Sequence, residues 1–196
     1  MADNQIVILD DLLRNIEGIL GRITTSKLDA YALTQNRLQQ VDVSTDEEYQ
    51  KTYNGFYRVR LPLTEAYSTY YNLIEKNKNN NNPSLEKILN ELLAATQRVE
   101  TSFGSKLIAT VNPNVAPLDS IVLGHLGLLL PARTGQSNSE RIKQCVNVHN
   151  QLVGRMNLLI TKPEFQQLKE RFVQKFPDYN FTDVKILDLL LWQYRP

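Results

Sequence analysis

The chain has 196 residues, of which 42% are hydrophobic and 22% charged, enough for one sizeable core or two small ones. Its 22 lysines and arginines nearly balance its 21 aspartates and glutamates, which excludes a global electrostatic attraction to nucleic acid or to an anionic membrane. The single cysteine, Cys145, excludes an internal disulfide and any iron–sulfur or multi-cysteine metal site, as expected in a reducing compartment.

The N-terminal segment carries acidic residues around its short apolar run, where a secretory signal peptide would have basic ones. No apolar run in the sequence approaches the roughly 18 residues needed to span a bilayer. We therefore expect a soluble, cytoplasmic protein that has no membrane partner and no cofactor.

The N-terminal third of the chain shows helical spacing of its apolar residues. Between residues 6 and 23 they recur at steps of three and four, which marks one apolar stripe on a helix. The stripe consists of Leu9, Leu12, Leu13, Ile16, Ile19, Leu20 and Ile23. A second, more polar helix is predicted over 27–40, and the acidic residues behind Ser44 and Thr45 indicate the capped start of a third.

Two breaks follow, each of a different kind. Residues 53–56, Tyr-Asn-Gly-Phe, predict a turn, and Pro62 fits the first turn of the helix after it. The asparagine-rich tract 77–82, which ends at Pro83, predicts a solvated loop because asparagine competes for the hydrogen bonds of a helix.

Helical patterns also fill the second half. Ser84 is expected to cap a helix with an apolar face up to Val99, and residues 101–104 either interrupt it or let it run on into a short helix over 105–111. Further helices are predicted over 119–130, where Pro131 ends the helix, and over 139–160. Another is predicted from a cap at Thr161 to residue 176. The last helix is predicted from Thr182 onwards, and its inward-facing residues are Ile186, Leu187, Leu190 and Leu191.

No alternating run is long enough for a strand, and no internal repeat is present. The predicted fold class is all-α, a compact multi-helix domain with an N-terminal helical extension. We divide the chain into an N-terminal helical part (1–76), a linker (77–83) and a C-terminal helical part (84–196) that packs with the first as one domain.

Residues 114–128, NVAPLDSIVLGHLGL, place Asp119 directly before an apolar helix. Its carboxylate there can accept hydrogen bonds from the first free backbone amides, which is worth about 1 kcal/mol. A carboxylate at the positive end of a helix is also suited to steady a cation or to activate a nucleophile. The position alone leaves a helix cap and a catalytic carboxylate both open.

Residues 102–128, SFGSKLIATVNPNVAPLDSIVLGHLGL, resemble the core of the helix-hairpin-helix DNA glycosylase superfamily. In that superfamily a glycine-containing hairpin leads into a helix with a lysine, and a catalytic aspartate then begins a helix that ends in Leu-Gly-Leu. The resemblance implies a catalytic role for Asp119, a nucleophilic role for Lys106, and DNA contacts at Gly104 and Ser105.

The chemistry that the resemblance implies is base excision. A damaged base would be flipped out of the stack, a carboxylate would steady the positive charge that develops at the sugar, and an amine would capture C1′ as a Schiff base. A scaffold of this family that has lost its catalysis is the alternative, so the sequence leaves open whether any reaction is catalysed.

Other polar residues each have a functional and an ordinary interpretation. The basic residues Arg133, Arg141, Lys143 and Arg155 would track phosphates along one edge of the domain or form a solvated face. Cys145 and His149, four apart on one helix, could begin a metal site, but only His125 offers another imidazole and ordinary packing is favoured.

The richest aromatic cluster consists of Tyr53, Phe56, Tyr57, Tyr67, Tyr70 and Tyr71. Such rings stack on unpaired bases, but at helical spacing they more often form a core or a protein interface. Two functions therefore stay open. One is DNA binding or base excision on a glycosylase-like scaffold; the other is a non-enzymatic helical module that meets a protein partner or a second copy through its tyrosine-rich face.

Overall fold

Eleven helices and no strand make up the part of the chain that the computed structural model describes, residues 3–61, 64–80 and 82–196, which confirms the all-α prediction. In chain order the helices are α1 (Asp3–Arg14), α2 (Ile16–Arg22), α3 (Thr25–Arg37), α4 (Glu47–Tyr57), α5 (Thr64–Asn77), α6 (Leu85–Thr96), α7 (Thr101–Val111), α8 (Ser120–His125), α9 (Asn138–Leu159), α10 (Pro163–Lys175) and α11 (Asp183–Gln193). Within the described residues, no helix combines the length and the apolar content that crossing a membrane requires.

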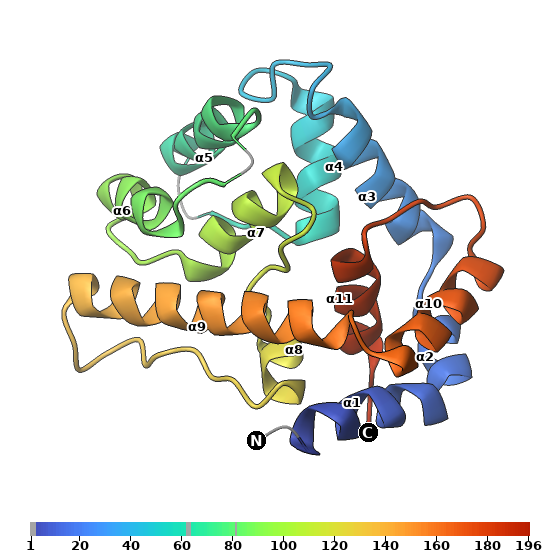
Figure 1. Cartoon of the computed structure of the whole chain (residues 1–196). Helices are drawn as coiled ribbons and strands as arrows, with labels where there is room; N and C mark the ends of the chain where they lie inside the picture. The colour runs from blue at the N-terminus through green and yellow to red at the C-terminus, as the bar shows by residue number, and fades with distance from the viewer. Residues whose placement is uncertain (1–2, 62–63, 81) are drawn as a thin grey trace.

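The long helix α9 crosses the molecule, with α5, α6 and α7 above it and α1 and α8 below it in Figure 1. Helix α11 lies near the centre and contacts α2, α8, α9 and α10. All its residues from 184 to 191 are buried, as expected for a helix that is enclosed on every side. The four inward positions predicted for this helix are thereby confirmed.

The N-terminal helices α1 and α2 contact α10, and α2 also contacts α11. Arg22 adds a hydrogen bond from its Nε to the carbonyl oxygen of Gln193, at 2.8 Å. The predicted N-terminal extension is therefore packed against the C-terminal helices. On the other side of the molecule, α5 contacts α6 and α7 across residues 78–84; the division into parts at this linker stays a prediction.

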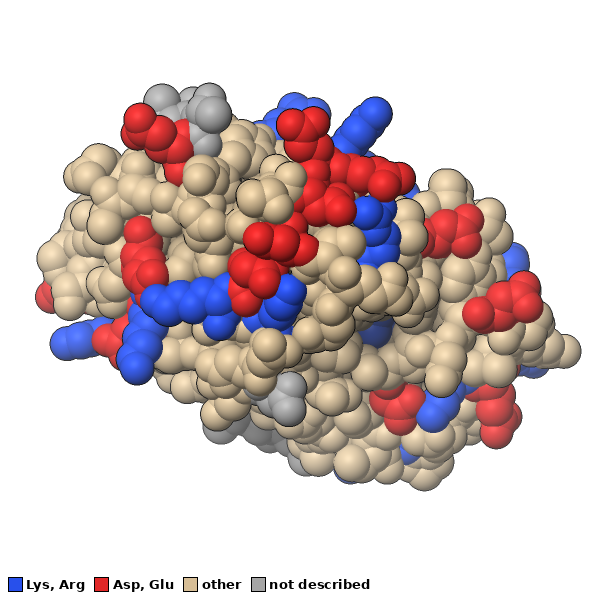
Figure 2. All heavy atoms as spheres, turned by 90° about the horizontal axis from the view of Figure 1, so that it is seen from above, with Lys and Arg blue, Asp and Glu red and all other residues tan. Residues whose placement is uncertain are grey.

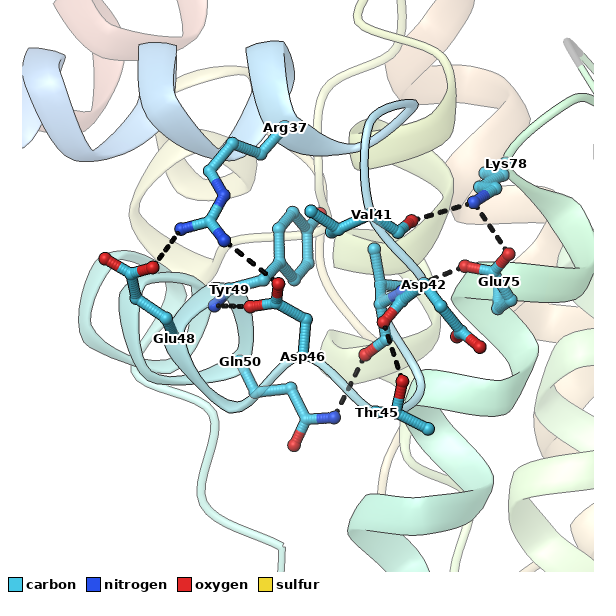
Figure 3. A network of polar contacts seen from close by, with 11 residues as sticks. Arg37, Val41, Asp42, Thr45, Asp46, Glu48, Tyr49, Gln50, Glu75 and Lys78 are labelled. Atoms are coloured by element: carbon cyan, nitrogen blue, oxygen red, sulfur yellow. Dashed lines mark hydrogen bonds and ion pairs between the residues drawn. The ribbon is translucent and has the colours of Figure 1, made fainter.

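A polar network fixes the connection between α3 and α4 and ties it to the end of α5 (Figure 3). Arg37 forms ion pairs with Asp46 and Glu48, at 2.9 and 2.7 Å. Just after α5, Lys78 forms an ion pair with Glu75 at 2.6 Å and donates a hydrogen bond to the carbonyl oxygen of Val41, in the connection between α3 and α4, at 2.9 Å. The predicted asparagine-rich loop is therefore anchored at its start, while Asn79, Asn80 and Asn82 are exposed.

The helix predicted over 6–23 is divided at Asn15, which ends α1 and precedes α2. The Asn15 side chain donates to the carbonyl oxygen of Asp11 at 2.8 Å and so competes with the helical hydrogen bonds. The apolar stripe still continues through both helices: Leu9, Leu12, Ile16, Ile19, Leu20 and Ile23 are all buried.

The turn predicted over 53–56 is wrong, because these residues lie inside α4. Tyr49, Tyr53 and Tyr57 recur every four residues along this helix and all three are buried. Burial of three rings outweighs the turn preference of Asn54 and Gly55, whose combined cost in a helix is about 1–2 kcal/mol. The position predicted for Pro62 lies outside the described residues.

The helix predicted over 119–130 is shorter than expected, since α8 ends at His125. Gly127 has a φ of +63°, and the amide of Leu128 donates to the carbonyl oxygen of Leu123 at 2.8 Å. This is a Schellman motif, in which a left-handed glycine closes the helix and two apolar side chains, here Leu123 and Leu128, are buried beside it.

Two helices are capped one or two residues away from the position predicted from the sequence. Asp46, rather than Ser44 or Thr45, caps α4 by accepting from the amide of Tyr49. Thr161 does not cap α10, because its hydroxyl donates to the carbonyl oxygen of Leu158 and Lys162 takes the cap position. Further caps are Ser84 for α6, as predicted, the box of Ser137 and Glu140 for α9, and Thr182 for α11.

Candidate functional site

Asp119 is the N-cap of α8. Its carboxylate accepts hydrogen bonds from the backbone amides of Ile121 and Val122, at 2.8 and 3.4 Å. The side chain is half-buried, and both bonds use the same oxygen, Oδ1, so Oδ2 is left out of the cap. The capping interpretation is therefore confirmed, and the catalytic one stays a prediction.

Replacing Asp119 by alanine is expected to lower the free energy of unfolding by about 1 kcal/mol, because two amides lose their acceptor. Asp119→Asn keeps a capping oxygen and should lose clearly less. Urea denaturation of the two variants beside the parent protein measures both values. Equal losses in the two variants would mean that the charge, and not the cap, is what stabilises this helix start.

Lys106 lies on α7 and is half-buried. Its ammonium donates to the carbonyl oxygen of Tyr57 at 2.8 Å and lies 5.4 Å from the ring centroid of Phe103. Burial lowers the pKa of Lys106, whereas the nearby Asp119 carboxylate raises it and Arg58 lowers it further. The structure thus brings Lys106 and Asp119 close enough for their charges to interact.

Arg58 is the third charged residue of this group and is exposed. Its φ of +53° places it in the left-handed region, where it forms the C-cap of α4. This conformation costs a residue with a side chain on the order of 1 kcal/mol relative to glycine. The charges of Asp119 and Arg58 therefore both act on the Lys106 ammonium, which is hydrogen-bonded to the carbonyl oxygen of Tyr57.

The resemblance placed DNA contacts at Gly104 and Ser105, and both residues are buried within α7. The amide of Gly104 donates to the carbonyl oxygen of Glu100 at 2.9 Å, and the Ser105 hydroxyl accepts from the amide of Leu118 at 3.0 Å. Neither residue is at the turn between α6 and α7, which is formed by 97–100. Their polar groups already have protein partners.

Gly104 is explained by helix packing, since a Cβ atom here would lie 2.7 Å from the side chain of Leu89. We expect Gly104→Val to destabilise the fold by about 1–3 kcal/mol through overpacking. The matched control is Gly21→Val, where nothing lies within 4 Å of a Cβ atom and the change should stay within about 0.5 kcal/mol. Thermal denaturation compares them, and equal losses would contradict the packing argument.

The four residues of the predicted basic edge differ in their exposure and in their hydrogen bonds. Arg133 and Lys143 are exposed, whereas Arg141 is half-buried with an Nε that has no hydrogen-bond partner in the described residues. Arg155 donates a hydrogen bond to the carbonyl oxygen of Leu126, the C-cap residue of α8. On the face shown in Figure 2, lysine and arginine alternate with aspartate and glutamate, so this face has no continuous basic field.

The tyrosine-rich face lies inside the protein. Tyr53, Tyr57, Tyr70 and Tyr71 are buried, and the Tyr53 hydroxyl bonds to the Tyr70 hydroxyl at 2.8 Å. Thr110 donates to the Tyr53 hydroxyl at 3.2 Å, and Tyr70 donates to the carbonyl oxygen of Phe103 at 3.0 Å. Four of the six rings are therefore core side chains, whereas Phe56 and Tyr67 are half-buried, and a partner bound through this cluster stays a prediction.

Cys145 and His149 are both buried on α9. The Cys145 sulfur lies 3.1 Å from the Thr101 hydroxyl, and His149 Nε2 has no hydrogen-bond partner in the described residues. Burial lowers the pKa of His149 to about 4. Across the described part of the chain, no three histidine, cysteine, aspartate or glutamate side chains are grouped as metal ligands.

A surface groove with a volume of about 320 Å³ lies between α3 and the segment that joins α10 to α11. It is lined by Tyr31, Ala32, Gln35 and Asn36 of α3, by Pro113, and by Asp178, Tyr179, Asn180, Phe181 and Thr182. Neither Lys106 nor Asp119 lines it. The lining combines aromatic rings with side-chain amides and lacks a paired nucleophile and base, so it is suited to binding rather than to acid–base chemistry.

Sequence reasoning missed this groove because three segments far apart in the chain form it. The local signal was the pair of aromatic residues in the loop before α11, Tyr179 and Phe181, since large rings outside a helix need a packing partner or a ligand. No family model, curated protein or solved structure matches the chain. The resemblance to the glycosylase superfamily is untouched by these comparisons and stays a prediction.

Proposed function

We propose that this protein is a non-enzymatic helical module that binds a protein partner through the groove between α3 and residues 178–182. The observation that supports it is the groove lining, in which aromatic and amide side chains typical of protein interfaces lie together. Leu33 extends this surface: it is 42% exposed and shares a helical stripe with Asp29 and Asn36. We place this role in the cytoplasm, as the sequence predicts.

Site-directed photo-crosslinking in an extract of the source cells tests the proposal. The crosslinker is placed at Leu33, beside the groove, and in a matched control at Leu158 of α9, which is equally exposed at 44%. We expect an adduct from Leu33 that is absent from Leu158 and that the groove variant Asn180→Arg abolishes. Once the adduct is identified, the purified partner should bind Asn180→Arg at least about tenfold more weakly than the parent protein.

An adduct that Asn180→Arg leaves unchanged would contradict the proposal. Asn180 is exposed, so its replacement should leave the fold intact, and circular dichroism of the variant checks this. A partner that binds the parent and the variant with equal affinity would likewise place the interface elsewhere on the molecule.

A second candidate is DNA recognition with glycosylase-like chemistry at Lys106 and Asp119. The observation that favours it is the half-buried amine of Lys106, whose pKa burial lowers, next to a carboxylate. A lowered pKa increases the fraction of neutral amine, the form that attacks C1′. The near-neutral net charge and the burial of Gly104 and Ser105 make it the weaker candidate.

Labelled duplexes, intact or carrying an abasic site, test this candidate across a salt series. Lesion-dependent binding that weakens with salt, and covalent trapping by borohydride that Lys106→Ala abolishes, would support it. Asp119→Asn should then bind the lesion but trap more slowly. Absence of binding at low salt, with both variants folded like the parent, would eliminate it.

A further inference from the structure

The groove has a negative electrostatic character that its aromatic lining does not explain. Asp178 lines it, and Asp29 of α3 accepts a hydrogen bond from the Tyr179 hydroxyl at 2.7 Å, which holds a second carboxylate beside it. The described lining residues include no lysine, arginine or histidine. The hydrogen bond to Asp29, together with the charges of Asp29 and Asp178, raises the pKa of Tyr179.

Three aromatic rings form a continuous surface in the groove. Phe181 lies between Tyr31, at a centroid distance of 5.0 Å and edge to face, and Tyr179, at 5.5 Å. Tyr31 is buried and the Lys185 ammonium lies 4.6 Å from its ring centroid, so Tyr31 forms the floor. Phe181 and Tyr179 are only half-buried and offer ring surface to a ligand.

The positive charge beneath the floor is compensated within the protein. Lys185 Nζ lies 2.8 Å from Asp188 Oδ2, and both side chains are buried. The charged side chain that lines the groove is therefore Asp178, and the Asp29 carboxylate is bonded to the lining residue Tyr179. Both carboxylates would attract a cation and repel a phosphate or a carboxylate.

The loop wall of the groove is held in place at both ends. The amide of Tyr179 donates to the carbonyl oxygen of Phe176 at 3.3 Å. At the other end the Thr182 hydroxyl donates to the carbonyl oxygen of Pro113 at 2.6 Å and accepts from the amide of Lys185. A wall that is ordered before binding loses little conformational entropy when a ligand enters.

We infer that this groove binds an arginine side chain in an extended segment of the protein partner, with the guanidinium against Phe181 and Tyr179 and facing Asp178. The inference rests on the proposed function. A planar guanidinium stacks on aromatic rings and donates in a fork to a carboxylate, which an ammonium does less well. Asn36 and Asn180 provide amide donors and acceptors at the edge of the groove, which suit the backbone of an extended peptide.

Nuclear magnetic resonance titration of the ¹⁵N-labelled full chain tests the inference. The probes are the Nα-acetyl, N-methylamide derivatives of arginine, lysine and norleucine. We expect the arginine probe to shift the amide resonances of residues 178–182, the lysine probe to bind more weakly, and the norleucine probe to leave them unchanged. Asp178→Asn should weaken arginine binding about fivefold.

The control variant is Asp183→Asn, which changes a nearby carboxylate that pairs with Lys169 at 2.7 Å and does not line the groove. It should bind the arginine probe like the parent. Equal shifts with norleucine, or binding that Asp178→Asn leaves unchanged, would overturn the inference, and so would the absence of any shift at the solubility limit of the arginine probe.

The inference and the proposed function fail in different ways. If the arginine probe does not bind but the Leu33 adduct still depends on Asn180, the groove is an interface for a segment of another chemistry and only the inference falls. If the adduct is also independent of Asn180, both fall.

Discussion

Replacing Lys185 by methionine is expected to lower the free energy of unfolding by about 3–5 kcal/mol, because the Asp188 carboxylate is then left buried without a partner. Lys185 and Asp188 lie one turn apart on α11, at a distance of 2.8 Å between Nζ and Oδ2, and each side chain is 8% exposed. Burial lowers the pKa of Lys185, but the attraction of Asp188 outweighs it and leaves this pKa above its ordinary value.

The rings next to the Lys185 ammonium carry no charge that could replace it beside Asp188. The Lys185 ammonium also contacts the rings of Tyr31 and Phe56, at 4.6 and 5.1 Å from their centroids. The Asp119 carboxylate makes a smaller contribution that raises the pKa of both Lys185 and Asp188. When Lys185 is removed, the buried Asp188 carboxylate therefore loses its cation while the negative charge of Asp119 still acts on it.

A double-mutant cycle separates the loss of an interaction from the cost of an orphaned charge. Lys185→Met together with Asp188→Leu removes both charges at similar volume, so the double variant should be more stable than either single variant. The control pair is Lys169 and Asp183, at 2.7 Å but 39% and 34% exposed, where Lys169→Met should cost less than about 1 kcal/mol. A double variant as unstable as the sum of the singles would contradict this account.

The long helices were predictable because their apolar period is sustained. In α11 the expected inward positions are buried, the cap supplied by Ser84 was recognised from its residue type and position, and the last helix begins after Thr182 as expected. The boundaries that failed depend on tertiary contacts. The local sequence at Asn54 and Gly55 predicts a turn. These residues lie in α4 because the tyrosines of the same helix, Tyr49, Tyr53 and Tyr57, are packed in the core.

The candidate site was predictable only in part. The resemblance implied roles for Lys106 and Asp119, which stay predictions, and in the folded chain the charge of Asp119 acts on Lys106. The burial of Gly104 was not, because it depends on Leu89 of the neighbouring helix. The groove itself was not predictable, since its walls come from three segments that are far apart in the sequence; the rings of Tyr179 and Phe181 were its one local signal. The burial of Lys185 and Asp188 was not predictable either, because their spacing of three is equally common on an exposed helix and a sequence does not state which helix is enclosed.

The second large effect is expected from pH. His149 is buried, and its pKa in the folded protein lies near 4, compared with an ordinary value of 6.5. As pH falls below 6.5, the unfolded chain binds a proton at His149 while the folded protein does not, so the free energy of unfolding falls until pH 4 is reached. The total loss from this residue is about 3 kcal/mol, since each unit of pKa difference corresponds to about 1.4 kcal/mol.

Urea denaturation of the parent and of His149→Leu between pH 4 and 7 isolates this contribution, because all other titrating groups are common to both proteins. At pH 7 the variant should be at least as stable as the parent, since it removes a buried nitrogen, Nε2, that has no hydrogen-bond partner among the described residues. The difference in free energy should then grow in favour of the variant as pH falls, and level off near pH 4. A difference that is constant over this range would show that His149 binds its proton equally well in the folded and unfolded chain, and that the imidazole is not enclosed by α9 and its neighbours.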